Sequence, residues 1–235
     1  MRVGRGKADL RPLTIERRVL DHAEGSALVS LGRTRVLCAA TVEEKLPSHL
    51  LGKQQGWITA EYAMLPRATQ ERTQRERKNG VAGRTQEIQR LIGRSLRASA
   101  DLRLLPGRTI TLDCDVLQAD GGTRVTAIIG SYVALFDALN GLLNRGAIDE
   151  WPLLHRIGAI SVGVVDGEMF LDLDYIEDSR AAVDLNMVAT AKGDVIEVQG
   201  TAEQGPVSRQ VLDDLLDLGI LGVLEIIERV DAVLR

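Results

Sequence analysis

The sequence predicts a two-layer α+β fold in which mixed β-sheets pack against helices. Short apolar runs with alternating side chains, which are typical of strands, recur along most of the chain. Three longer stretches carry apolar residues at helical spacing instead. The 235 residues are 45% hydrophobic and 26% charged, which excludes a disordered or fibrous chain. Because no repeat or low-complexity linker interrupts these elements, we expect one domain over residues 1–235.

The first third of the chain predicts paired strands followed by a long loop. Residues 26–42 form two strand-like runs joined by a turn at Gly32, and residues 57–64 form another. Residues 67–83 are polar, cationic and rich in turn residues near their end. A loop of this length is usually functional or disordered, so this exposed cationic loop is the first place to look for function.

An amphipathic helix is predicted from Arg84 onward. Arg90, Arg94 and Arg97 share one face of it, which we expect to be solvated, and Asp101 is spaced for an ion pair with Arg97. The opposite face carries an apolar stripe at helical spacing. The stripe consists of Ile88, Leu91, Ile92 and Leu96.

Strands and helices alternate over the rest of the chain. Residues 109–117 predict a strand, Asp120-Gly121-Gly122 a turn, and residues 125–143 a largely buried helix. A last amphipathic helix is predicted after Ser208. Between these helices lie two predicted strand pairs, 159–165 with 169–175 and 183–189 with 195–198.

Charge is divided unevenly along the chain, although the net charge is only −4. Residues 67–108 contain 11 Lys and Arg against 4 Asp and Glu, whereas residues 109–235 contain 8 against 22. This asymmetry predicts an anionic partner for the middle segment, with carboxylates supplied by the acidic half.

Several other classes of protein are excluded or disfavoured. No apolar run reaches the roughly 20 residues that span a bilayer, and the first residues lack the apolar stretch of a signal peptide, so we expect a cytoplasmic protein. Cys38 and Cys114 have no Cys or His at metal-ligand spacing, which predicts two buried thiols rather than a zinc site or disulfide. The three histidines are scattered, which disfavours a nucleophilic triad.

The sharpest local motif is Gly121-Gly122-Thr123-Arg124, between a predicted strand and a predicted helix. Glycines let the backbone approach a ligand, and successive N–H groups at a helix start attract anions. Arg124 opposes the helix dipole at this position unless an anion lies beside it, and phosphate is the natural candidate. The alternative is an ordinary glycine turn with Thr123 as the helix N-cap.

Two further features suggest groups that would act beside such an anion. Arg84 also begins a predicted helix, so it and Arg124 could hold one phosphate from two sides. Asp178 and Asp184 would lie close together if their segments form a hairpin, with Asn186 on the same strand face as Asp184. Two close carboxylates can hold a divalent cation, or one can keep a proton, but from these residues alone a solvated strand end is the favoured explanation.

Several blocks of sequence, in one order along nearly the whole chain, resemble the ribonuclease PH family of phosphate-dependent 3′-to-5′ exoribonucleases. Blocks in a fixed order are more specific than any single motif. They are residues 22–26 (HAEGS), 55–62 (QGWITAEY), 83–85 (GRT), 87–94 (EIQRLIGR), 112–124 (LDCDVLQADGGTR), 175–179 (YIEDS), 184–186 (DLN) and 196–203 (IEVQGTAE).

The resemblance implies a ribonuclease PH-like fold, also described as ribosomal protein S5 domain 2-like and shared with exosome and polynucleotide phosphorylase subunits. It implies a homo-hexamer built as a trimer of dimers. The implied reaction uses inorganic phosphate as co-substrate, removes 3′-terminal nucleotides as nucleoside 5′-diphosphates, and is reversible. The implied partner is RNA with a single-stranded 3′ end, especially transfer RNA precursors.

The family's functional positions can be carried over to this sequence. Its catalytic carboxylates correspond to Asp178 and Asp184, which would bind Mg²⁺ or supply an acid. Its RNA-gripping loop corresponds to residues 67–80. Its phosphate contacts correspond to Arg84, Gly122, Thr123 and Arg124, and its RNA contacts to Arg67, Arg72, Arg75 and Arg77.

Two other functions remain open. The chain could be a non-catalytic RNA-binding ring subunit, which the presence of all the implied phosphate and carboxylate positions disfavours. It could also be a phosphate- or nucleotide-sensing domain without RNA, which the cationic loop disfavours less strongly.

Overall fold

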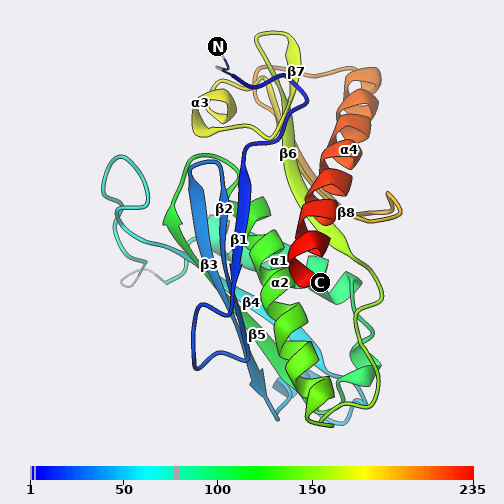
Figure 1. Ribbon diagram of the computed structural model, residues 1–235. Coiled ribbons are helices and arrows are strands. Elements are labelled where there is room, and N and C mark those ends of the chain that lie inside the picture. Colours follow the sequence, from blue (N-terminus) through cyan, green and yellow to red (C-terminus); the bar gives the residue numbers. More distant parts are fainter. Residues whose placement is uncertain (1, 3, 77–79) are drawn as a thin grey trace.

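The first sheet has five strands in the order β1-β2-β3-β5-β4 and comes from the first half of the chain (Figure 1). The computed structural model describes residues 2, 4–76 and 80–235. Neighbouring strands are antiparallel except β4 and β5, which run parallel. The strands are β1 (Leu13–Arg17), β2 (Gly25–Leu31), β3 (Thr34–Glu43), β4 (Trp57–Met64) and β5 (Thr109–Gln118).

The second sheet is antiparallel throughout and has four strands in the order β7-β6-β8-β9. Its central strands β6 and β8 are almost entirely buried, as their continuous apolar sequences predict. The strands are β6 (Ile157–Val165), β7 (Glu168–Leu171), β8 (Val183–Thr190) and β9 (Val195–Ala202).

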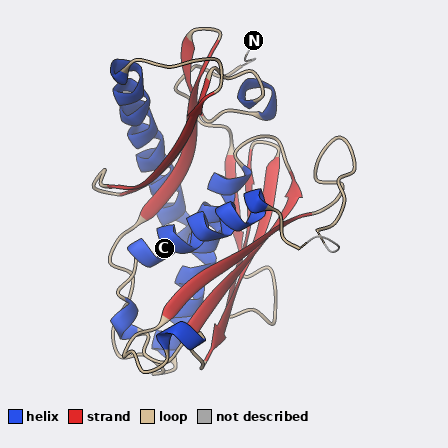
Figure 2. Ribbon diagram, turned by 180° about the vertical axis from the view of Figure 1, so that it is seen from behind, coloured by secondary structure: helices blue, strands red, loops and turns tan. Residues whose placement is uncertain are grey.

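The helices pack between and beside the two sheets, and one hydrophobic core continues through both (Figure 2). Helix α2 packs on β2 and β3 and also touches β6, while α1 packs on β4 and α4 on β6 and β8. The fold class is therefore α+β with mixed sheets, as predicted. The helices are α1 (Gly83–Ala98), α2 (Thr123–Asn144), α3 (Tyr175–Asp178) and α4 (Arg209–Leu234), with short 3₁₀ helices at Ser48–Leu50 and Leu102–Leu104.

Helix α2 lies unusually close to the first sheet. A Cβ added at Gly25 would lie 2.0 Å from the carbonyl oxygen of Ala134, and one added at Gly130 would lie 2.6 Å from Cys38 Sγ. Glycine is required at both contacts because neither partner can withdraw. By length and composition α2 could cross a membrane, but 83% of its most apolar window is buried inside this fold. It is the central helix of the core, and its close packing on the first sheet fixes the position of its N-terminus.

Most predicted elements are present, with differences at their ends. Strand β7 stops at Leu171 rather than at residue 175, because Asp172 has a left-handed backbone with φ of 56°. Asp174 then caps the short helix α3 in a capping box with Glu177. The edge strand β1 was not predicted, since its five residues are too few to establish alternation. The last helix follows Ser208 as predicted, and Ser208 is its N-cap.

Arg97 does not lie on a solvated face, so this prediction was wrong. Its guanidinium carbon lies 4.2 Å from the centre of the Trp57 ring, and its Nη1 donates to the carbonyl oxygen of Ile58 at 2.8 Å. Burial, and then the charge of Arg94, lowers the pKa of Arg97. Asp101 pairs with Arg103 instead. Because α1 packs on β4, the guanidinium of Arg97 contacts the strand rather than facing water.

Candidate active site

A cavity of about 770 Å³ is lined by residues from both sheets. The end of β5 and the starts of α1 and α2 form one part of its wall, and β6, α3 and β8 form another. Residues that are far apart in the sequence therefore meet here. Among the predicted site residues, Arg67, Arg84, Gly122, Thr123, Arg124, Asp178 and Asp184 all line this cavity.

The glycine turn that precedes α2 presents its backbone to the cavity. Gly121 and Gly122 have left-handed φ values of 77° and 66°, which other residues rarely adopt. Gly122 occupies the N-cap position of α2 without a side-chain cap, and Thr123 is the first helical residue. The alternative with Thr123 as N-cap is therefore wrong. The first residues of this long helix, whose N–H groups have no partner within the helix, line the cavity at this point.

Tyr62 on β4 holds the Thr123 side chain and was not predicted to belong to the site. Its hydroxyl lies 3.0 Å from Thr123 Oγ1, and both residues are buried. Burial raises the pKa of Tyr62, opposed by the hydrogen bond to Thr123 and by the charges of Arg84 and Arg124. The Tyr62 phenol is therefore neutral at pH 7. A tyrosine in an alternating strand gives no sequence signal for this contact.

The two predicted arginines reach the same part of the cavity. Arg84 is exposed at the start of α1, whereas the Arg124 side chain is only 15% exposed. Arg124 Nη1 lies 3.2 Å from Gln199 Oε1 on β9 and 3.4 Å from Glu87 Oε1 on α1. Burial raises the pKa of Asp178 and of Asp184, and the charges of Arg84 and Arg124 both oppose this rise. The two guanidinium groups and the two carboxylates thus form one electrostatic cluster.

Asp178 and Asp184 are close together, but not through a hairpin. Asp178 ends α3, while Asp184 lies on β8 between β6 and β9. Burial raises the pKa of Asp178. Burial, together with the charge of Asp178, raises the pKa of Asp184 to about 6, and Asn186 Nδ2 donates weakly to Asp184 Oδ2 at 3.3 Å. Neither carboxylate is an idle, fully solvated group at a strand end.

The cavity offers few ligands for a metal. Within residues 2, 4–76 and 80–235, no group of three or more His, Cys, Asp and Glu side chains is placed to hold an ion. Asp178 and Asp184, which lie together in this cavity, could supply two carboxylate groups to a cation here. This set suits Mg²⁺, which binds to one or two carboxylates and completes its shell with water and substrate phosphate oxygens.

The cationic loop projects from the sheet (Figures 1 and 2), and near its start it is anchored to the end of β5. Ala68 is buried, and its carbonyl oxygen accepts a hydrogen bond from the backbone N–H of Ala119 at 2.9 Å. Arg67, beside this anchor, lines the cavity, whereas Arg72 and Arg75 are exposed further out. The predicted contact at Arg77 lies outside the described residues.

Comparisons with known proteins agree with this architecture. Two family models match, "3′ exoribonuclease family, domain 1" over residues 9–139 and "domain 2" over residues 155–221. A curated ribonuclease PH from Moorella thermoacetica is 58% identical over 225 residues, which cover 95% of this chain and 90% of that protein.

Three solved structures share the fold at low sequence identity. They are Rrp46 from rice (Oryza sativa), an archaeal exosome core, and an Archaeoglobus fulgidus exosome with RNA bound to the active site. Their TM-scores are 0.79, 0.77 and 0.79, and their identities are 23%, 21% and 22%. The matches cover 99%, 97% and 96% of this chain and 99%, 90% and 91% of the other chains.

Proposed function

Because this chain belongs to the ribonuclease PH family of 3′ exoribonucleases, we propose that its cavity is where inorganic phosphate attacks the 3′-terminal linkage of RNA. The chain is a phosphorolytic 3′-to-5′ exoribonuclease. One observation supports this use of the cavity above all others. Arg84 and Arg124, which lie at the starts of separate helices, line the same cavity as the two carboxylates and the glycine turn.

The reaction exchanges one phosphorus–oxygen bond for another. An oxygen of inorganic phosphate attacks the phosphorus between the last two nucleotides, in line with the departing 3′ oxygen. The bond from phosphorus to that oxygen breaks, the oxygen takes a proton, and the terminal nucleotide leaves as a nucleoside 5′-diphosphate. Because the phosphodiester bond that breaks and the phosphoanhydride bond that forms are similar in free energy, the reaction runs in both directions.

The main task of the site is to bring two anions together. Arg84, Arg124 and the N–H groups of the Gly122–Thr123 turn supply positive charge and donors, which matter most in a site that partly excludes water. The Thr123 hydroxyl, oriented by Tyr62, adds one more donor for phosphate. Fixed donors of this kind stabilise the transition state without reorganising.

Two carboxylates beside two anionic substrates would repel them unless their charge is offset. We propose that Asp178 and Asp184 hold one Mg²⁺, which supplies positive charge to the reacting phosphates. The raised pKa of Asp184 supports a second assignment, in which its carboxyl keeps a proton and gives it to the departing oxygen. The two assignments differ in their pH dependence.

We expect Mg²⁺ to stabilise the folded protein, because an ion that binds only the native state shifts the unfolding equilibrium. Millimolar MgCl₂ should raise the melting temperature of the unmodified chain at pH 7.5, and Asp178→Asn should abolish this shift. The matched control is Asp213→Asn, which removes an exposed carboxylate from α4. An Mg²⁺-dependent shift of equal size in Asp178→Asn would place the ion elsewhere.

The cationic loop is proposed to bind RNA through phosphate contacts at Arg67, Arg72, Arg75 and Arg77. Replacing Arg72 and Arg75 by Gln should weaken RNA binding and flatten its salt dependence. For a single strand, the slope of log K against log salt should become less negative by roughly 0.7 for each RNA phosphate contact that is lost. Binding of a short single-stranded RNA is measured by fluorescence anisotropy at a series of KCl concentrations.

The control for this loop prediction removes two charges from elsewhere on the surface. Arg103 and Arg209 are exposed and already paired with Asp101 and Asp213. The double variant Arg103→Gln/Arg209→Gln should leave the slope unchanged. Equal slopes in the loop variant and the unmodified chain would assign RNA binding to another surface.

One assay tests the proposed reaction as a whole. A short RNA is incubated with and without inorganic phosphate, and the products are separated by chromatography. Nucleoside diphosphates that appear only with phosphate are the expected result. Nucleoside monophosphates formed without phosphate would indicate hydrolysis, and intact RNA under both conditions would favour the non-catalytic ring subunit.

We further propose transfer RNA precursors as preferred substrates and a cytoplasmic homo-hexamer, a trimer of dimers, as the working form. The archaeal exosome core among the structures that share this fold supports an assembled form. The free thiols of Cys38 and Cys114 suit a reducing compartment. Light scattering should give six times the chain mass, and a precursor with a 3′ extension should be trimmed faster than an unstructured RNA of equal length.

A further inference from the structure

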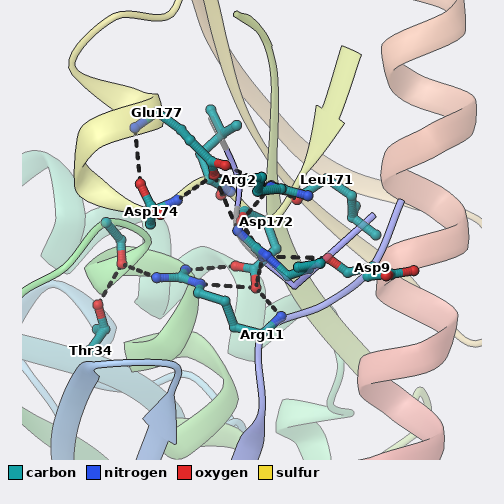
Figure 3. Close-up of polar contacts among 12 residues, drawn as sticks. Arg2, Asp9, Arg11, Thr34, Leu171, Asp172, Asp174 and Glu177 are labelled. Atoms are coloured by element: carbon teal, nitrogen blue, oxygen red, sulfur yellow. Dashed lines mark hydrogen bonds and ion pairs between the residues drawn. The ribbon is translucent and has the colours of Figure 1, made fainter. Parts of the chain in front are cut away.

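We propose that Arg11 is a positioning residue for phosphate, because it joins the glycine turn before α2 to the segment that carries Asp178. This inference rests on the proposed function of the cavity. Arg11 does not line that cavity and belongs to none of the sequence blocks that carry the family resemblance. It lies behind the site, where the segment before β1 passes between the two sheets (Figures 1 and 3).

The Arg11 guanidinium contacts both sides of the site at once (Figure 3). Its Nη2 and Nε donate to the two carboxylate oxygens of Asp172 at 2.6 and 2.9 Å, and its backbone N–H donates to Asp172 Oδ2 at 2.7 Å. Its Nη1 donates in the other direction, to the carbonyl oxygen of Asp120 at 2.6 Å. Arg11 is only 5% exposed and Asp172 is fully buried, so water cannot replace these contacts.

The contact with Asp120 fixes the backbone of the glycine turn. Thr34 Oγ1 accepts from the N–H of Asp120 at 2.9 Å and donates to the carbonyl oxygen of Gly121 at 2.6 Å. Arg11 binds the remaining carbonyl, that of Asp120. A Cβ added at Gly122 would lie 3.0 Å from Arg11 Nη2, so the guanidinium lies directly against the turn. The directions of the N–H groups offered to phosphate therefore depend on Arg11.

The contact with Asp172 fixes the carboxylate side of the site. Asp172 has the left-handed backbone that ends β7, a conformation that is strained for a residue other than glycine. Its N–H donates to the carbonyl oxygen of Ser161 at 2.7 Å, and the next N–H donates to Ser161 Oγ at 3.1 Å. From this point the chain enters α3 and reaches Asp178. The ion pair with Arg11 holds Asp172 at the bend.

The glycine turn and the segment that follows Asp172 also contact each other directly, so neither can be displaced far. A Cβ added at Gly121 would lie 2.6 Å from the carbonyl oxygen of Leu173 and 2.8 Å from the backbone nitrogen of Tyr175. Only the planar fork of arginine can bind a carboxylate through two nitrogens and a carbonyl through the third. Lysine at position 11 would keep the positive charge but would not bind the Asp172 carboxylate and the Asp120 carbonyl together.

The test compares Arg11 with Arg5, which binds the same carboxylate without touching the turn. Arg5 Nη1 donates to the carbonyl oxygen of Asp172 at 2.8 Å and to its Oδ2 at 3.2 Å. We expect Arg11→Lys to raise the KM for phosphate by about 10- to 100-fold, the effect of a displacement of about 1 Å, with the KM for RNA unchanged. Arg5→Lys should change the KM for phosphate less than twofold.

A double variant separates positioning from stability. Arg11→Met leaves a buried carboxylate unpaired and should lower the melting temperature. Arg11→Met/Asp172→Asn removes both charges and should recover most of that loss, since Asn tolerates a left-handed backbone. The KM for phosphate should stay high in the double variant, because the Asp120 carbonyl still lacks its donor. Recovery of phosphate KM together with melting temperature would show a purely structural role and overturn the inference.

Failure of the inference can be distinguished from failure of the proposed function. The unmodified chain is assayed first for nucleoside diphosphates at saturating phosphate. Their absence would reject the proposed function and, with it, the role of Arg11. Their presence, combined with a normal KM for phosphate in Arg11→Lys, would reject the role of Arg11 alone.

Discussion

An Arg124→Gln variant should need roughly 10- to 150-fold more phosphate for half-maximal phosphorolysis than the unmodified chain. Loss of one charge-assisted hydrogen bond costs about 1.5–3 kcal/mol, and each 1.4 kcal/mol is a factor of ten. In the part of the chain that the structure describes, Arg124 bonds only through Nη1, to Gln199 and Glu87. Its Nε and Nη2 are therefore available to form a fork with phosphate.

The control for this prediction is Arg90→Gln, which removes one exposed positive charge from α1 outside the cavity. Initial rates are measured across phosphate concentrations at fixed, saturating RNA and constant ionic strength. Arg90→Gln should behave as the unmodified chain does. An Arg124→Gln variant with normal phosphate dependence would remove Arg124 from the site and leave Arg84 without its partner.

Asp184→Asn should nearly abolish phosphorolysis while making the protein more stable at pH 7.5. The carboxyl of Asp184 has its pKa raised to about 6 from an ordinary value of 3.8, by burial and by Asp178. The folded state therefore holds this proton more tightly than the unfolded state, and the free energy of unfolding falls as pH rises between these values. The amide cannot ionise, so the variant avoids a penalty of up to about 3 kcal/mol.

The stability gain must depend on pH if this explanation is correct. Thermal unfolding of both proteins is compared at pH 7.5 and at pH 3.5. The melting temperature of Asp184→Asn should exceed that of the unmodified chain at pH 7.5, and the difference should shrink at pH 3.5, where Asp184 is largely protonated in both states. A constant difference would attribute the gain to packing rather than to ionisation.

The pKa of Asp184 also predicts how the activity depends on pH. If Asp184 binds Mg²⁺ as a carboxylate, which is the assignment we expect, kcat should rise as pH increases through about 6. If it acts as an acid, kcat should fall over that range. A rate that does not change between pH 5 and pH 7.5 would contradict both assignments.

Periodicity predicted most elements of this fold because their apolar faces are the ones that pack. Ile88, Leu91, Ile92 and Leu96 all lie in the core, as their spacing on α1 indicates. Arg97 shows the limit of this reasoning. Its charge predicted a solvated face, but the guanidinium lies over the Trp57 ring, and no pattern on α1 reveals what lies opposite it.

The candidate site was predictable only where its signal is local. The pair Gly121-Gly122 before a helix start marked the turn, because the left-handed backbone and the close approach are properties of that short segment. Helix starts and strand ends only suggested that Arg84, Asp178 and Asp184 act beside it, and the family resemblance was needed to favour that interpretation over solvated side chains. Arg11 and Asp172 lie 161 residues apart, and nothing near either residue in the sequence indicates their contact.

The position of the first residues decides where an affinity tag should be attached. Arg2 and Arg5 both pair with Glu177, the residue before Asp178. An affinity tag joined ahead of Arg2 would begin next to α3 and could displace the Asp178 carboxylate. The opposite end lies beside β1, where Arg17 Nη1 donates to the Val233 carbonyl oxygen at 2.7 Å, and no β1 residue lines the cavity. Purification handles for this enzyme belong at its carboxyl end.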